Sequence, residues 1–166
     1  MLTGRRTLRD GIVVGLIGYL AVAIFYSVFD VLATRGALYT VDLLGKAVFR
    51  GLRDPGVLLF PAQLDPVAIV WYNALHLVLA LSIGIVVTGL ISYAEEHPGQ
   101  TYLVLFVIVG GLIVTVTAVG LLTDAIRPVL PWWSIVVANV LASVLAAAYL
   151  LVRRPGLLRR FVPLAA

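Results

Sequence analysis

Four long runs of apolar residues, separated by short polar stretches, dominate the sequence. They cover residues 11–32, 67–93, 102–123 and 132–152. At a rise of 1.5 Å per residue, a helix over each run is long enough to cross a hydrocarbon core of about 30 Å. The pattern predicts an all-α membrane protein, a bundle of four transmembrane helices in one integral membrane domain over residues 1–166.

A shorter pattern lies between the first two runs, at residues 41–53. Asp42, Lys46 and Arg50 recur every four residues on one helical face, and apolar residues occupy the opposite face. This stretch is too short to cross the bilayer, so we expect an amphipathic helix that lies in the headgroup plane. Thr40 is its expected N-cap, and the Asp-Pro-Gly sequence that follows is its expected end.

Small residues recur at intervals of three or four along the predicted spans. Small side chains let two membrane helices approach closely, so we expect helix contacts at these positions. They are Gly11, Gly15 and Gly18 in the first span, Gly84 in the second, and Ser134, Ala138, Ala142 and Ala146 in the fourth.

The spans also show a weak internal similarity. Residues 73–80 resemble residues 139–146, which would make two hairpins related by an axis along the membrane normal. Chance similarity among Leu, Val and Ala is the simpler explanation, and both interpretations remain open.

The first ten residues are basic and precede an apolar run, as in a secretory signal peptide. The run 11–32 is longer than the 7–15 residues of a typical signal-peptide core. We therefore expect an uncleaved span.

Composition and charge support membrane insertion. Hydrophobic residues make up 62% of the chain and charged residues 12%, about half the share in soluble domains. Seven arginines flank the termini, and five basic residues lie on the other side of the four spans. This modest bias favours cytoplasmic termini in a bacterial cytoplasmic membrane. The expected interfacial residues are Lys46, Arg50, Arg53, Trp71, Trp132 and Trp133.

Several kinds of chemistry find no support in the sequence. Cysteine is absent and the single methionine is Met1, which leaves no thiolate or thioether ligands. We find no nucleophile elbow, zinc-protease motif or phosphate loop, so we expect neither an enzyme nor a metal site. The short arginine flanks suit lipid headgroups, not nucleic acid. We expect the turn Glu95-Glu96-His97-Pro98 to be solvated.

A few polar residues are expected in the outer half of the bundle. They are Asp30, Asn73, His76, Asp124 and Asn139. An ionisable group within a membrane is a functional hypothesis by default, here a path for protons or small solutes. The alternative is structural. His76 and the two asparagines would form interhelical hydrogen bonds, and Asp30 and Asp124 would form solvated or interfacial ion pairs with Arg35 and Arg127.

The favoured function is a non-catalytic structural or accessory subunit of a larger membrane complex. Its partners would be the bilayer and either other membrane subunits or further copies of the chain. One alternative is a small oligomeric transporter or proton conductor that uses the outer polar cluster. The other is a subunit that binds haem or chlorophyll through His76. His97 is 21 residues away, about 30 Å along a helix, so the two histidines cannot share one haem.

Overall fold

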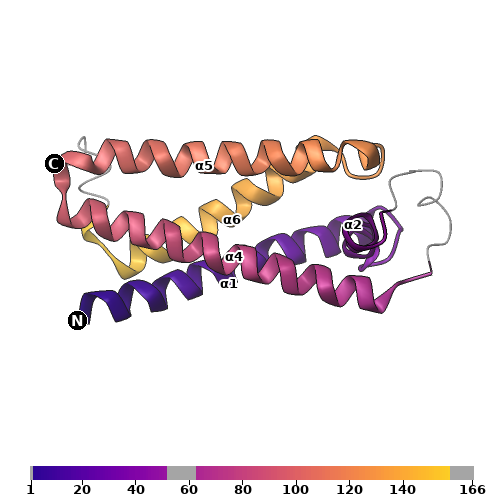
Figure 1. Ribbon diagram of the computed structural model, residues 1–166, viewed down its shortest axis with the longest axis horizontal. Helices are drawn as coiled ribbons and strands as arrows, with labels where there is room; N and C mark the ends of the chain where they lie inside the picture. The colour runs from indigo at the N-terminus through magenta and orange to yellow at the C-terminus, as the bar shows by residue number, and fades with distance from the viewer. Residues whose placement is uncertain (1, 52–62, 158–166) are drawn as a thin grey trace.

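A computed structural model of the protein describes residues 2–51 and 63–157, and this part of the chain is helical and contains no strand (Figure 1). Four helices are long and apolar enough to cross a membrane, as the sequence predicts. They are α1 (Leu2–Leu32), α4 (Pro66–Glu96), α5 (Thr101–Leu122) and α6 (Trp132–Arg153). Among the described residues, three shorter elements lie between them, namely α2 (Tyr39–Phe49), η1 (Pro98–Gln100) and η2 (Asp124–Ile126).

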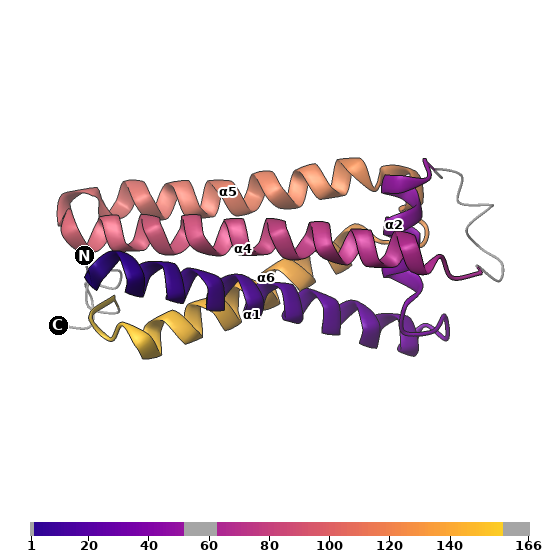
Figure 2. The same cartoon turned by 60° about the horizontal axis from the view of Figure 1, so that its bottom comes forward.

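The long helices lie side by side, and α2 lies across one end of them (Figures 1 and 2). The beginning of α1 and the end of α6 lie at the opposite end from α2. Helix α4 begins after Asp65, whose carboxylate accepts hydrogen bonds from the backbone N–H groups of Val67 and Ala68. Pro66 is the first helical residue, where its missing N–H costs nothing.

Helices α1 and α4 approach closely at three glycines. A Cβ added to Gly15 would lie 2.6 Å from Cα of Leu81, and one added to Gly11 would lie 2.7 Å from Cα of Ile85. A Cβ on Gly84 would meet the backbone of both glycines. Gly18 differs, because no atom lies within 4 Å of its Cβ position. The close contact therefore lies in the half of α1 nearer the N-terminus.

The other small positions lie on α6. Ser134 and Ala138 have no exposed surface, and Ala142 and Ala146 are half-buried. Ala146 packs beside Leu150 at the end of the molecule where α6 ends.

The two predicted hairpins are not equivalent in their packing. Helix α5 contributes only three fully buried residues, Thr101, Val104 and Gly120. Gly120 lies against the Trp132 ring of α6, whereas Gly110 and Gly111 have open space at their Cβ positions. The third span thus has no glycine contact equivalent to the one that joins α1 to α4.

Helix α2 differs from its predicted bounds. It begins at Tyr39, two residues early, and ends at Phe49, followed by Gly51 in the left-handed region at φ +69°. The prediction that Thr40 is the N-cap is wrong, because Thr40 lies inside the helix and donates to Asp30 instead. Arg53 and the Asp-Pro-Gly sequence lie outside the described residues.

Candidate functional site

Asp30 forms a buried joint between α1 and α2. It is 1% exposed, and its carboxylate accepts from the Thr40 backbone N–H at 2.7 Å and from the Thr40 hydroxyl at 2.6 Å. The expected solvated ion pair with Arg35 is therefore incorrect. Arg35 instead donates to the Val129 carbonyl at 2.9 Å and lies over the ring of Tyr39. Two hydrogen bonds to a charged acceptor make Asp30 a strong anchor for α2.

Further charged contacts join α2 to the start of α4. Asp42, 1% exposed, accepts from Lys46 at 2.6 Å and from the Asp65 backbone N–H at 2.7 Å. Lys46 also donates to the Gln63 carbonyl. Arg50 donates to Asp65 at 3.0 Å, and this hydrogen bond, with the backbone N–H groups at the start of α4, lowers the pKa of the Asp65 carboxyl. The polar face of α2 is thus directed toward other parts of the protein.

A backbone contact brings α2 close to α4. A Cβ added to Gly45 would lie 2.6 Å from the carbonyl oxygen of Ala68. Leu43 enters a buried cluster with Ile126, Leu130 and Ile135, at the end of the molecule where α6 begins. Both faces of α2 therefore contact the protein along part of its length.

Asn73 and His76 lie together on α4, where α1 packs against it. The Tyr19 hydroxyl donates to Oδ1 of Asn73 at 2.9 Å, and Nδ2 of Asn73 donates back to the Ile69 carbonyl. The His76 ring lies 5.3 Å from the Tyr19 ring and 6.2 Å from the Tyr72 ring, measured between centroids. These contacts place His76 among aromatic side chains.

Asp124 and Asn139 form separate local contacts. Asp124 is exposed on η2 and forms an ion pair with Arg127, as expected from their spacing. Asn139 donates to the Ile135 carbonyl one turn earlier on its own helix, at 2.8 Å. The described contacts of the five expected residues therefore divide into an α1–α2 joint, an α1–α4 pair and two local interactions.

The predicted interfacial residues lie in varied settings. Trp71 and Trp133 are more than half exposed, and Trp133 contacts Phe29 edge to face. Trp132 is half-buried between Gly120 and Arg127.

A second ionic cluster lies at the other end of the molecule and was not predicted from the sequence. Arg154 follows the end of α6, and its side chain is only 5% exposed. It binds Asp10 on α1 through Nε at 3.1 Å and Nη2 at 3.0 Å. Its Nη1 donates to Glu95 at 2.7 Å and to Ser92 at 2.9 Å, both on α4. One guanidinium therefore joins three spans, and Glu95 does not belong to the solvated turn.

Asp10 could have been suspected from its position in the sequence. It lies on the same helical face as Val14 and Ala21, and all three are buried. A carboxylate that continues a buried apolar face needs a partner. Nothing in the sequence pointed to Arg154, which is 144 residues away.

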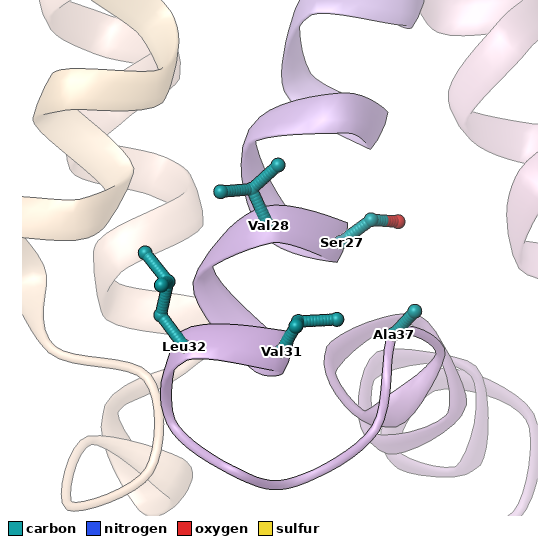
Figure 3. A pocket seen from close by; sticks show the side chains of 5 residues that line it. All are labelled: Ser27, Val28, Val31, Leu32 and Ala37. Carbon is teal, nitrogen blue, oxygen red and sulfur yellow. The ribbon is translucent and has the colours of Figure 1, made fainter.

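Two hollows on the surface of residues 2–51 and 63–157 bear on the question of a binding site. One, of about 380 Å³, lies beside the Arg154 cluster and is lined by Arg6, Thr7, Ser92, Glu95, Glu96, Arg154 and Pro155. The other, of about 240 Å³, lies where α1 turns toward α2 and is lined by Ser27, Val28, Val31, Leu32 and Ala37 (Figure 3). Its lining is aliphatic apart from one hydroxyl, so it offers little chemistry.

No group of three or more His, Asp or Glu side chains in residues 2–51 and 63–157 has the geometry to hold a metal ion. Several of the buried polar groups, such as Asp30 and Arg154, instead join one helix to another.

Comparison with known proteins does not assign the chain to a family. No protein-family model, curated protein or solved structure matches it significantly.

Proposed function

We propose that this protein is a non-catalytic accessory subunit of a larger membrane assembly. Helices α1, α4, α5 and α6 would form a transmembrane bundle, with both termini on the cytoplasmic side of a bacterial cytoplasmic membrane. Helix α2 would lie near the outer headgroups as an amphipathic element.

The observation that carries the proposal is the use of polar side chains to connect helices. The Arg154 cluster joins α1, α4 and the end of α6, and Asp30 joins α1 to α2. Beside the Arg154 cluster, the Thr7 and Ser92 hydroxyls lie 2.9 Å apart. Between the cluster and Asp30, Tyr19 binds Asn73. These side chains are hydrogen-bonded within the protein, which supports a structural role. A transport path would need polar side chains that can exchange these partners for a proton or solute.

The α1–α4 interface also favours a scaffold over a conductor. Gly11, Gly15 and Gly84 bring the two backbones into contact, which leaves no space for a solute between the helices at that level. Outside this interface, α5 presents apolar side chains such as Phe106 and Val114, which are 75% and 68% exposed. Lipid or the spans of a partner subunit can cover them.

The test is affinity purification of the tagged, full-length protein from its native membrane in a mild detergent. Co-purifying chains are identified and quantified, and a tagged unrelated four-span protein serves as the control. We expect one or more membrane proteins in fixed stoichiometry. A homo-oligomer without other chains would contradict the subunit role and favour transport. A visible absorption band lost in His76→Ala would favour a haem or pigment subunit.

A further inference from the structure

The hollow beside the Arg154 cluster has opposite charges on its walls. Arg6 on α1 provides an exposed guanidinium, and Glu96 at the end of α4 provides an exposed carboxylate. One Nη2 hydrogen bond of Arg6, to the Arg153 carbonyl at 2.9 Å, holds its side chain across to α6. A guanidinium has five N–H donors, so within the described part of the chain Arg6 has several left for another acceptor.

The charge balance favours a cationic group near Glu95 and Glu96. Arg154 is shared between buried Asp10 and partly exposed Glu95, which leaves these three side chains with a formal charge of −1. Glu96 adds a second negative charge, and Arg6 offsets one of the two. Asp10 also has one carboxylate oxygen that is buried without a hydrogen-bond partner in the described structure. The local field therefore favours a ligand with a positive group on the Glu side and an anionic group at Arg6.

The place of the hollow indicates where such a ligand comes from. Its lining residues belong to the start of α1, the end of α4 and the residues around the end of α6. These helix ends lie together at one end of the molecule (Figure 1). The apolar lengths of these helices begin within a few residues of the hollow. With the helices across a bilayer, the hollow lies at the depth of the phospholipid headgroups.

We propose that this hollow binds the headgroup of a phospholipid with a primary ammonium, of the phosphatidylethanolamine type. The phosphate accepts hydrogen bonds from Arg6, and the ammonium donates to Glu96 and lies in the negative field of Glu95. The acyl chains extend along the apolar surface of the adjoining helices. The bound lipid would thus contact the end of the molecule where the Arg154 cluster joins α1, α4 and α6.

The chemistry distinguishes this headgroup from two common alternatives. A quaternary ammonium, as in phosphatidylcholine, carries the same charge but no N–H donor for a carboxylate. Phosphatidylglycerol has no cationic group, so its phosphate could bind Arg6 but the carboxylates of Glu95 and Glu96 would gain no counter-charge. Anionic lipids in general are attracted by the exposed basic side chains of Arg5, Arg9 and Arg153. A preference for phosphatidylethanolamine would therefore come from the hollow itself.

The experiment measures which lipid stays bound. The full-length protein is incorporated into nanodiscs that contain equal amounts of the three lipids, extracted in mild detergent and weighed with its bound lipids by native mass spectrometry. We expect one phosphatidylethanolamine per chain, in severalfold excess over the other two. Arg6→Gln and Glu96→Gln should each lower its retention by about two- to fivefold, the range for exposed ion pairs. Arg9→Gln is the matched control, because Arg9 is equally basic but does not line the hollow, and it should leave retention unchanged.

Several results would overturn the proposal. These are equal retention of all three lipids, a preference for phosphatidylglycerol, or an equal loss in Arg9→Gln. The wild-type lipid series decides the question even if a variant fails to fold. The inference rests on the membrane placement proposed above but not on the subunit role. A protein without partners would leave the lipid site standing, and a protein without lipid preference would leave the subunit role standing.

Discussion

The α1–α4 contact predicts that Gly84 cannot be enlarged without loss of stability. An added Cβ would lie 2.8 Å from Cα of Gly15 and closer still to two other backbone atoms of α1, whereas ordinary contacts begin near 3.4 Å. Because these neighbours are backbone, no side chain can rotate away. To restore an ordinary contact of 3.4 Å with the nearest of these atoms, the two helices would have to separate by about 1 Å.

The size of the effect follows from two opposing contributions. Overpacking of this kind costs about 1–3 kcal/mol. Alanine also favours a helix over glycine by up to about 1 kcal/mol, which offsets part of that cost. Gly89→Ala supplies the matched control, since Gly89 is on the same helix and its Cβ position is open. The propensity gain is common to both variants, so their difference in free energy of unfolding should be about 1–3 kcal/mol, with Gly84→Ala the less stable.

The assay is unfolding by sodium dodecyl sulfate in mixed micelles. Tryptophan fluorescence can report the transition, because the chain has three tryptophans and none lies at the substituted positions. Equal midpoints for Gly84→Ala and Gly89→Ala would refute the close approach of α1 and α4. The same result would remove the steric argument against a solute path between them.

Three other contacts give predictions of the same kind. Arg154→Met leaves Asp10 buried without its partner and should lower the free energy of unfolding by about 3–5 kcal/mol in the same assay, whereas adding Asp10→Leu should recover much of the loss. A double variant whose loss equals the sum of the two single losses would contradict the pairing. Thr40→Val removes one hydrogen bond to Asp30 and should increase the rate of hydrogen exchange in α2 by about tenfold, while the rate in α5 stays unchanged. An unaltered rate in α2 would contradict the Asp30 joint between α1 and α2. The pKa of Asp65 is lowered on folding, so its stabilisation of the start of α4 is present above the ordinary Asp pKa and is lost as the pH falls through the lowered value. Hydrogen exchange at the start of α4 should therefore be independent of Asp65 ionisation from pH 5 to 8 and rise only below about pH 3.9. Asp65→Asn should abolish that rise, and a transition between pH 5 and 8 would contradict this linkage.

The sequence predicted the four long helices because their signal is local. Each apolar run is long enough by itself to identify a spanning helix, and the prolines and charged residues between runs locate the turns. The α2 helix was also found, but its bounds were shifted because Thr40 satisfies a carboxylate on another helix. Local capping rules cannot detect that competition.

The contacts between distant residues could not be obtained in this way. Asp10 and Arg154 are 144 residues apart, and both were assigned to basic flanks of the membrane spans. Asp30 was assigned to a solvated ion pair because Arg35 is close in sequence, whereas the fold brings the Thr40 donors closer. Tyr19 was not considered, although it links α1 to Asn73. In each case, the partner is determined by how helices pack, which hydropathy alone does not specify.

The arrangement of the four spans across a bilayer is the central claim, and single-cysteine labelling tests it most directly. The chain has no cysteine, so each introduced one reports a single position. Gly4→Cys, Gly99→Cys and Ala125→Cys lie at exposed sites near the start of α1, between α4 and α5, and between α5 and α6. A membrane-impermeant maleimide added to intact cells should label Ala125→Cys alone, and the other two should react only in inverted vesicles. Labelling of Gly4→Cys and Ala125→Cys from the same side, or of all three from both sides, would contradict the four-span arrangement.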